Sequence, residues 1–371
     1  MTTTINNEQK KLNVPNLRFP EFQGEWEKCT LEDVINFSTT RVNSSELNKD
    51  NYVSTENMLQ DYQGIVKAKS VPEDVNVVSF SCGDILISNI RPYLKKVWKA
   101  TFNGGCSSDV FVLKANDNIE SDYLHYVIAN DKFINFVMSG AKGVKMPRGD
   151  KKQMETYSLS LPQIQEQHKI ARLLSLLDER IATQNKIIDK LQSLIKGIAQ
   201  NIVRNNKPNV RISDCLECNS STLQESDVCE HGTYPVYGAN GIVGYLKNYN
   251  TEGEAVYIIK DGSGVGTVSY VTGKCSATGT LNTLQAKEGY FLQYLYYLLK
   301  VFNFEPYKTG MAIPHIYFKD YGKAKVFCPS YTEQLRYARL LSAIDNKQSI
   351  EQNILTGLTL QKQCLLRQMF I

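Results

Sequence analysis

Residues 162–178 read PQIQEQHKIARLLSLLD, and residues 329–345 read PSYTEQLRYARLLSAID. The second stretch repeats the first at an offset of 167 residues, and the same register extends back without a gap to Pro147 and Pro314. A period of this length far exceeds the roughly 20–50 residues of solenoid and propeller repeats, so each copy is a whole domain. The sequence therefore predicts two domains joined in tandem, in a molecule with pseudo-two-fold symmetry.

A long amphipathic helix is predicted at the end of each copy. In the first, apolar residues follow a four-three spacing that is typical of a coiled-coil seam and is interrupted only by Gln184. The second seam includes the polar residues Gln348, Glu351 and Lys362. We predict that the helices pair through Ile170, Leu174, Leu177, Ile181, Ile188 and Leu191 of the first and Leu341, Ile344, Leu355 and Leu358 of the second.

Helix length decides what covers these seams. A helix of about 40 residues is roughly 60 Å long, which is more than a small domain alone can cover. The other helix is the simplest partner, and the repeat favours an antiparallel pair. The alternative is two ordinary amphipathic helices, each packed on its own domain. The second helix has a clear start, because Ser330 and Glu333 have the spacing of a capping box.

The regions before the helices are rich in β-strand signals. Short apolar runs bounded by glycine and asparagine predict strands at 75–80, 84–88 and 110–113 in the first copy and at 255–259 and 267–271 in the second. The predicted fold is therefore of the mixed α/β (α+β) class, with two strand-rich domains related by pseudo-two-fold symmetry and separated by two long antiparallel coiled-coil helices. We expect a flexible tail at 1–15, domains at 16–161 and 206–329, and helices at 162–205 and 330–371.

Composition favours a globular cytoplasmic protein. Hydrophobic residues make up 42% and charged residues 22%, and no apolar run approaches the roughly 18 residues of a membrane helix. The polar start MTTTINNEQKKLNVPN has no apolar core of a secretion signal. Nine cysteines, an odd number in 371 residues, fit reduced thiols better than a disulfide framework. The net charge of +4 is a weak guide to partners.

One cluster has the residue types of a zinc site. Cys215, Cys218, Cys229 and His231 include the ligands of tetrahedral zinc. However, Cys215 matches Val34 of the first copy, where an apolar residue is expected. The sequence therefore favours no metal.

Catalytic motifs are also lacking. Gly262–Gly266 looks like a phosphate cradle, but a strand rather than a helix follows it, so a glycine-rich hairpin is expected. Asp150-Lys151-Lys152 is the only nuclease-like fragment, and no paired acid accompanies it. No methyltransferase motif of the Asp-Pro-Pro-Tyr type is present, and none of the four histidines, His125, His168, His231 and His315, has the spacing of a catalytic dyad or a metal site. We predict no catalytic residue and no cofactor for this chain.

Basic, polar and aromatic residues gather on glycine-bearing loops. Arginine and lysine bind phosphates or guanine edges, and asparagine can pair with adenine, so such loops suit a DNA groove. Plain solvation would explain the same composition. The candidate DNA contacts are Arg91, Tyr93, Lys95, Lys142, Lys145 and Arg148 in the first copy, and Tyr237, Asn240, Lys260, Ser263, Lys308 and His315 in the second.

Three stretches carry a family resemblance. LPQIQEQHKIARLLSLLDERI at 161–181 resembles the helix-opening motif of type I restriction-modification specificity subunits, and 329–345 repeats its core. GDILIS at 83–88 and YPVYGANGIVGY at 234–245 resemble the same family. With the duplication and both helices, the resemblance covers nearly all of the chain beyond residue 15.

The resemblance implies a function. Two target-recognition domains would each read one half of a split site in double-stranded DNA, and the paired helices would serve as a spacer. The subunit would have no activity of its own and would scaffold two modification (methyltransferase) subunits and two restriction (motor-nuclease) subunits. Those partners would hold AdoMet, ATP and magnesium, and the complex would act as an adenine-N6 methyltransferase and an ATP-dependent endonuclease.

The chain departs from the family pattern at some positions, and two other functions are possible alternatives. Lys142 and Lys145 have only Thr309 and Ala312 as counterparts. One alternative is the recognition subunit of a related system in which modification and cleavage share one polypeptide. Another is a tandem scaffold protein that does not read DNA.

Overall fold

The computed structural model describes residues 12–371. They divide into two compact units: the first runs to Ala182 and also contains Thr356–Ile371, and the second is Thr183–Leu355. Most of the predicted tail, residues 1–11, lies outside the described residues. Asn13, at the end of that predicted segment, donates to the carbonyl of Trp26 at 2.6 Å and accepts from the Ser160 hydroxyl at 3.0 Å.

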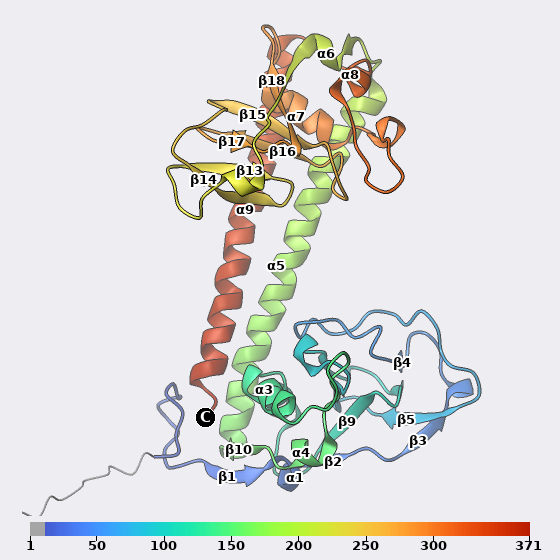
Figure 1. Ribbon diagram of the computed structural model, residues 1–371. Helices are drawn as coiled ribbons and strands as arrows, with labels where there is room; N and C mark the ends of the chain where they lie inside the picture. Colours follow the sequence, from blue (N-terminus) through green and yellow to red (C-terminus); the bar gives the residue numbers. More distant parts are fainter. Residues whose placement is uncertain (1–11) are drawn as a thin grey trace, which may run out of the picture. The chain divides into compact units, whose positions relative to one another are not determined.

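The first unit contains three sheets (Figure 1). A four-stranded antiparallel sheet has the order β2-β9-β6-β7, a mixed sheet has the order β3-β5-β8-β4, and β1 pairs with β10. The strands are β1 Glu27–Thr30, β2 Ile35–Phe37, β3 Arg41–Asn43, β4 Tyr52–Val53, β5 Asn76–Phe80, β6 Ile85–Ser88, β7 Val97–Lys99, β8 Gly104–Cys106, β9 Val110–Ala115 and β10 Ser158–Leu161.

Alternating side chains give the first unit three layers. Strand β6 sends Ile85 and Ile87 into a core shared with the helices, and it sends Leu86 into a second core shared with the mixed sheet. The four-stranded sheet is therefore covered by helices on one face and by strands on the other. The helical segments are α1 Leu31–Val34, α2 Ser121–Ile128, α3 Asp131–Ser139, α4 Lys151–Glu155 and the 3-10 turns η1 Ser44–Glu46 and η2 Pro92–Leu94.

The second unit repeats this architecture. Its sheets have the orders β12-β18-β15-β16, β14-β13-β17 and β11-β19. The strands are β11 Val210–Arg211, β12 Leu216–Ser220, β13 Tyr234–Gly238, β14 Gly241–Leu246, β15 Glu254–Ile259, β16 Val268–Thr272, β17 Ser276–Ala277, β18 Leu281–Ala286 and β19 Lys325–Val326. The helical segments are α6 Ile212–Cys215, α7 Leu292–Lys300, α8 Phe318–Tyr321 and the turns η3 Glu225–Asp227 and η4 Glu305–Tyr307.

The two units differ in what they add to the shared frame. The first has α3 where the second has only the turn η4. The first also has β3 and β5, whereas in the second the counterpart of β5 is a single bridge between Thr251 and Cys275. The second sheet of unit 2 consequently has three strands rather than four. The predicted strands are confirmed in both units, with shifts of one or two residues at some ends.

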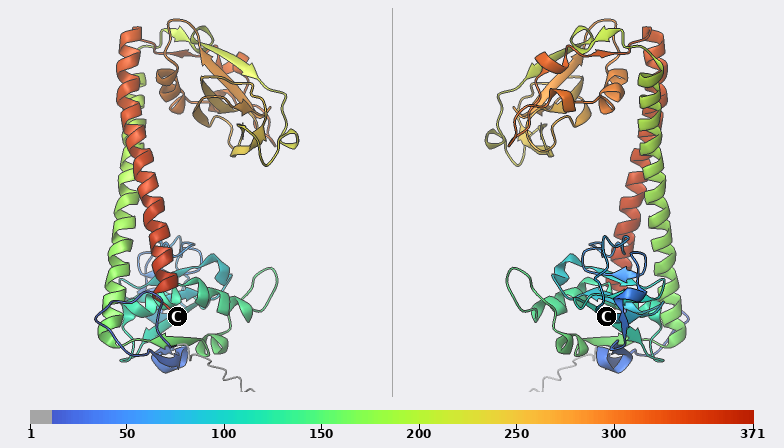
Figure 2. Two further views of the ribbon diagram at one scale, coloured as in Figure 1. Left: turned by 90° about the vertical axis from the view of Figure 1, so that its left-hand side faces the viewer. Right: turned by 90° about the vertical axis from the view of Figure 1, so that its right-hand side faces the viewer.

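The two long helices are α5, Ile164–Asn205, and α9, Tyr331–Gln368. In the first unit the beginning of α5 lies beside the end of α9, where Lys362 contacts Asp178 at 2.6 Å. In the second unit the rest of α5 lies beside the beginning of α9, where Gln184 contacts Glu351. The helices are therefore antiparallel (Figures 1 and 2). The Ser330 hydroxyl accepts from the Glu333 N–H at 3.4 Å and donates to its carboxylate at 2.9 Å, as expected of the start of α9.

The ends of both seams pack into the domain cores. Ile170 and Leu174 at the start of α5 share the first core with Met369 and Phe370, just after α9. Leu341 near the start of α9 shares the second core with residues of α5 such as Ile195 and Ile202. Of the other predicted pairing residues, Leu177, Ile188 and Leu358 are buried, and Ile181, Leu191, Ile344 and Leu355 are half-buried. Each domain is thus attached to both helices.

Among residues 12–371, no helix combines the length and the apolar character that crossing a membrane requires.

Candidate nucleic-acid interface

Two loops of the first unit form one surface. The turn η2 connects β6 to β7, and its flanking residues Arg91 and Lys95 both have left-handed backbones, with φ of 51° and 53°. The N–H of Arg91 donates to the carbonyl of Pro147 at 2.7 Å, and Ile90 forms a backbone bridge with Arg148. The η2 turn and the loop before α4 therefore meet, which brings Arg91 and Tyr93 together with the 142–148 loop.

Two basic residues of this surface form ion pairs. Lys142 lies 3.0 Å from Asp150, and Arg148 lies 3.2 Å from Asp109. The hydrogen bond from Lys142 holds the pKa of the Asp150 carboxyl below its usual range. The side chains of Arg91, Tyr93, Lys142, Lys145 and Arg148 are all exposed, so this set faces solvent.

Lys95 differs from the other candidates. It lies 2.8 Å from Asp131 and 5.9 Å from the centre of the Tyr62 ring. Its hydrogen bond lowers the pKa of the Asp131 carboxyl. Lys95 thus ties the β6–β7 connection to α3.

The second unit has the corresponding pair of loops. The β15–β16 connection contains Gly262–Gly266 and joins antiparallel strands, as the sequence predicts. The N–H of Gly262 donates to the carbonyl of Pro314 at 3.0 Å, and Asp261 forms a backbone bridge with His315. This arrangement matches that of Arg91, Pro147, Ile90 and Arg148. The second surface therefore contains Lys260, Ser263 and His315.

This second surface has its own electrostatics. The Nδ1 atom of His315 lies 3.2 Å from Asp261 Oδ1, and Lys308 lies 2.6 Å from Glu305. Lys260 and Lys319 line a hollow of about 430 Å³ next to Asp261. Basic groups are therefore present, but they are interspersed with carboxylates.

Tyr237 and Asn240 belong to a different sheet from the other candidates. Tyr237 is half-buried on β13, with its ring 5.7 Å from that of Tyr257. Asn240 is exposed in the β13–β14 turn. Tyr237 is placed as a packing residue, and Asn240 as a surface residue.

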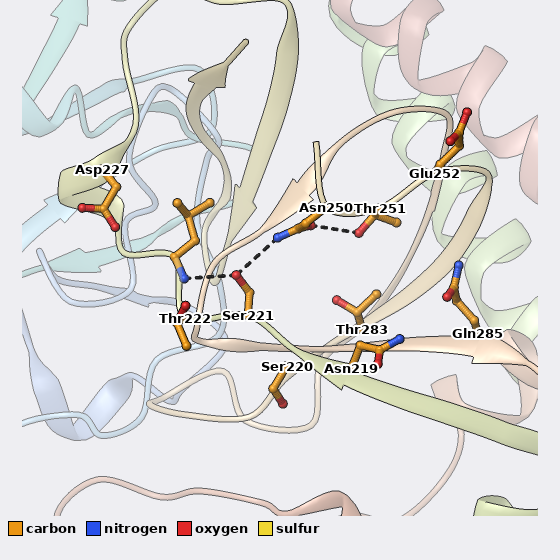
Figure 3. Close-up of a pocket in the computed structure, with 11 residues that line it drawn as sticks. Asn219, Ser220, Ser221, Thr222, Asp227, Asn250, Thr251, Glu252, Thr283 and Gln285 are labelled. Atoms are coloured by element: carbon orange, nitrogen blue, oxygen red, sulfur yellow. Dashed lines mark hydrogen bonds between the residues drawn. The ribbon is translucent and has the colours of Figure 1, made fainter. Parts of the chain in front are cut away.

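A polar hollow of about 700 Å³ opens in unit 2 beside β12 (Figure 3). Asn250 donates to the Ser221 hydroxyl at 3.3 Å, and Asn219 and Thr283 lie opposite each other on β12 and β18. It lies where the unit has only the Thr251–Cys275 bridge in place of β5. No lysine or arginine lines it, whereas the carboxylates of Asp227 and Glu252 do, so it does not suit phosphate. The remaining lining residues are Ser220, Thr222, Leu223 and Gln285.

The cysteine and histidine cluster does not come together. Cys215 is buried at the end of α6, in the place that Val34 occupies at the end of α1. Its hydrogen bond with Cys328, together with burial, raises the pKa of its thiol, and burial raises the pKa of Cys218 to about 11. Within residues 12–371, no three His, Cys, Asp or Glu side chains are grouped so that they could hold a metal ion. Cys215 is therefore a core residue.

Sequence reasoning missed the residues that attach each domain to its helix. The buried Gln167 accepts from the N–H of Glu120 at 2.8 Å and donates to the carbonyls of Asn118 and Pro162 at 3.1 and 2.9 Å. Gln334 accepts from the N–H of Phe291 and donates to the carbonyl of Pro329, both at 2.9 Å. The repetition of Glu-Gln at 166–167 and 333–334 was the available signal.

A second shared contact lies further along each helix. The Tyr126 hydroxyl donates to Asp178 at 2.9 Å, and the Tyr297 hydroxyl donates to Asp345 at 3.3 Å. The same two contacts therefore recur in both units.

Comparison with known proteins accounts for this duplication. The family model described as the type I restriction modification DNA specificity domain matches residues 23–193 and again residues 205–360. The chain belongs to the type I restriction-modification specificity family. Family membership, the mixed fold and the two specificity domains are thus as predicted from the sequence.

Relatives within the specificity family are distant. The chain is 28% identical over 124 residues to the specificity subunit of the type I restriction enzyme EcoDI from Escherichia coli. That match covers 33% of this chain and only 28% of the EcoDI subunit. A type I specificity subunit from Mycoplasma genitalium is 22% identical over 371 residues, which cover 93% of this chain and 94% of that subunit.

Solved structures show the same fold. The S subunit of a type I restriction-modification system from M. genitalium has a TM-score of 0.67 at 17% identity, covering 96% of this chain and 99% of that one. A chain from a solved structure of a type I restriction-modification system has a TM-score of 0.54 at 17% identity, covering 92% and 96%. Both solved chains share the fold described above.

Proposed function

We propose that this member of the specificity family reads a bipartite DNA site for a type I restriction-modification complex, with each domain reading one half. The chain itself carries out no reaction. The modification subunits supply methylation of adenine with AdoMet, and the restriction subunits supply ATP- and magnesium-dependent cleavage. Two subunits of each kind correspond to the two copies within the chain.

The observation that carries this proposal is a shared frame with different loop surfaces. In both units the hairpin of the four-stranded sheet is hydrogen bonded to the loop before α4 or α8. The first pair of loops presents Arg91, Lys145 and Arg148, whereas the second presents Lys260, Ser263 and His315. Equivalent loops with different polar groups suit two readers of different base sequences.

The long helices suit a spacer between the half-sites. Two readers on one face of a duplex enter successive major grooves when they lie about one helical turn, roughly 34 Å, apart. A 42-residue helix such as α5 is roughly 60 Å long. The exposed faces of the helix pair are the proposed docking surface for the modification subunits.

The experiment that tests the proposal is co-expression of this chain with a modification subunit of the same host, followed by single-molecule mapping of methylated adenines. We expect a new split motif with a constant gap. Exchange of residues 16–161 for another recognition domain should change one half of that motif and leave the other half unaltered.

Other outcomes separate the remaining functions. A stable complex that methylates no defined motif would favour a scaffold. Activity that requires a single partner polypeptide with fused modification and cleavage domains would favour the related fused system. An exchanged domain that leaves the motif unchanged would refute half-site reading.

A further inference from the structure

The two most exposed large apolar side chains among residues 12–371 occupy the same position in the two units. Val144 is 100% exposed and Met311 is 106% exposed. Two residues further on, Met146 and Ile313 are 49% and 60% exposed. Exposed apolar residues that are scattered singly need no explanation, but this pair recurs at the repeat offset of 167 residues.

Both loops are closed at the base by a pair of backbone hydrogen bonds. The N–H groups of Lys142 and Arg148 donate to each other's carbonyls at 3.0 and 2.9 Å, and those of Thr309 and His315 do so at 2.9 and 2.8 Å. A second bridge ties the base of each loop to its neighbouring hairpin. Both loops are therefore braced at the base, and the loop of the first unit projects from it (Figure 2).

A glycine lets each loop turn tightly before its apolar residues. Gly143 and Gly310 have φ of 98° and 87°, a region that favours glycine. A Cβ atom on Gly310 would lie 2.4 Å from the carbonyl oxygen of Ile313. The turn thus presents Val144 and Met146, or Met311 and Ile313, to solvent on a constrained backbone.

Basic side chains flank both apolar tips, and four of them are paired with Asp150, Asp109, Glu305 and Asp261. Lys145 lies between the two apolar residues of the first loop, and Lys142 and Arg148 bound it. The second loop is bounded by Lys308 and His315, with Lys260 and Lys319 on the adjoining hollow. Cations would contact phosphates while the apolar tip reaches the bases. A groove of double-stranded DNA combines those two chemistries in one partner.

We propose that the loops at 142–148 and 309–315 act as apolar wedges, each packing its two exposed side chains against an opened base step within its own half-site. Methionine and isoleucine are among the residues that proteins insert between base steps, where they partly unstack the duplex. Differing side chains on equivalent loops then contribute to the sequence preference of each half-site through the ease of opening the step. The inference rests on the proposed function, because it requires that each unit contacts DNA.

The test uses the complex of the full chain with its modification subunits. DNA duplexes carry 2-aminopurine at successive positions of the mapped half-sites, apart from the adenine that is methylated, and its fluorescence rises where stacking is lost. We expect a rise at one step in each half-site. The double variant Met311→Ser/Ile313→Ser should remove the rise in one half-site, and Val144→Ser/Met146→Ser should remove it in the other. In the complex these two side chains would be buried against DNA, so their loss should lower DNA affinity roughly ten- to hundredfold.

Matched controls are available in each unit. Val66→Ser and Ile242→Ser replace apolar residues that are 49% and 52% exposed outside the loops, and both should leave fluorescence and affinity unchanged. Because the loop residues are exposed and the loops close through backbone bonds, the variants should keep the wild-type melting temperature.

The outcomes separate this inference from the proposed function. A complex that methylates a bipartite motif without any 2-aminopurine response refutes the wedges and leaves half-site reading intact. Variants that lose the modification subunits on size-exclusion chromatography, while the wild type shows no unstacking, assign the loops to a protein interface instead. Absence of any motif refutes both proposals.

Discussion

The side-chain amide of Gln184 donates a hydrogen bond of 3.0 Å to the backbone carbonyl of Glu351, and these two residues are the same position of the two repeats. Its amide also contacts the Glu351 carboxylate. Only a pair of antiparallel helices that meet at their point of equivalence brings such residues together. Gln184 and Glu351, which interrupt the apolar seams of the two helices, therefore form one buried contact with each other.

We expect Gln184→Leu to lower the free energy of unfolding by about 1–3 kcal/mol, because buried polar groups of Glu351 lose a partner. The double variant Gln184→Leu/Glu351→Leu should recover the part of this loss that comes from the Glu351 carboxylate, because an apolar side chain then replaces that charged group while the backbone carbonyl remains. Thermal melting of the two variants checks the prediction, with Gln200→Leu on an exposed face of α5 as control. A double variant as unstable as the single one would contradict it.

Gln167 and Gln334 should matter in proportion to the hydrogen bonds they make. Gln167→Ala leaves three backbone groups unpaired and Gln334→Ala leaves two, at about 1–3 kcal/mol for each group that stays buried. Denaturant titration should show the larger loss for Gln167→Ala. If each domain reads one half-site, each variant should weaken recognition of one half only.

Acidification should destabilise the first unit through His125. Burial and the charge of nearby Lys362 lower the pKa of His125 to about 4, in surroundings that also contain Asp178, Lys99 and Asp122. The unfolded chain, with a histidine pKa near 6.5, binds the proton first as the pH falls. Stability is therefore fully present above about pH 6.5 and is lost as the pH falls to about 4.

Melting temperatures at pH 7.5 and pH 5 measure this loss. His125→Gln should show a smaller drop between them than the wild type, while His168→Gln, at an exposed position, should behave like the wild type. Equal drops for all three proteins would exclude His125 as the cause.

Exposed basic residues of the first surface should contribute phosphate contacts. We expect Arg91→Ala and Lys145→Ala each to weaken DNA binding by the complex and to reduce the slope of log affinity against log salt by about one. Lys28→Ala, an exposed residue of β1, is the control. A lower affinity with an unchanged salt slope would argue against a phosphate contact.

Chelation should leave the melting temperature unchanged, because Cys215 packs in a core. Cys215→Val reproduces the residue found at Val34, and the small increase in side-chain volume in a packed core should cost no more than about 1–3 kcal/mol. A large loss in either experiment, measured by thermal melting with and without EDTA, would restore the metal hypothesis.

The long helices and main strands could be predicted from the sequence because their apolar patterns are long and regular. The residue-by-residue match between the two copies before the long helices could not be predicted. In the sequence, YLHY at 123–126 resembles FLQY at 291–294, which would match Tyr123 with Phe291. In the structure, however, Gln167 binds the N–H of Glu120 where Gln334 binds that of Phe291. Tyr123 therefore corresponds to Tyr294, three residues further on. The offset is thus 171 residues (291 − 120) at this point and 167 in the helices, and the difference of four residues falls in the region where the first unit has α3 and the second has only η4.

The candidate surface was predicted only in part. Loop residues such as Arg91 and Arg148 stand out by charge, and their meeting depends on a backbone bond between Arg91 and Pro147. No composition rule reveals such a bond. Lys362, which looked like a flaw in the second seam, instead pairs with Asp178 and lies 5.7 Å from the centre of the Tyr126 ring.

Phe370 stacks on Tyr123 with ring centres 5.3 Å apart, inside the core of the first unit. A ribosome makes residues 183–355, the whole second unit, before it reaches Phe370. The first domain to be synthesised is consequently the last whose core is complete. During translation, apolar surface of the first unit stays exposed until the second unit and then Phe370 have been synthesised. Chaperones can act on the first unit during this interval.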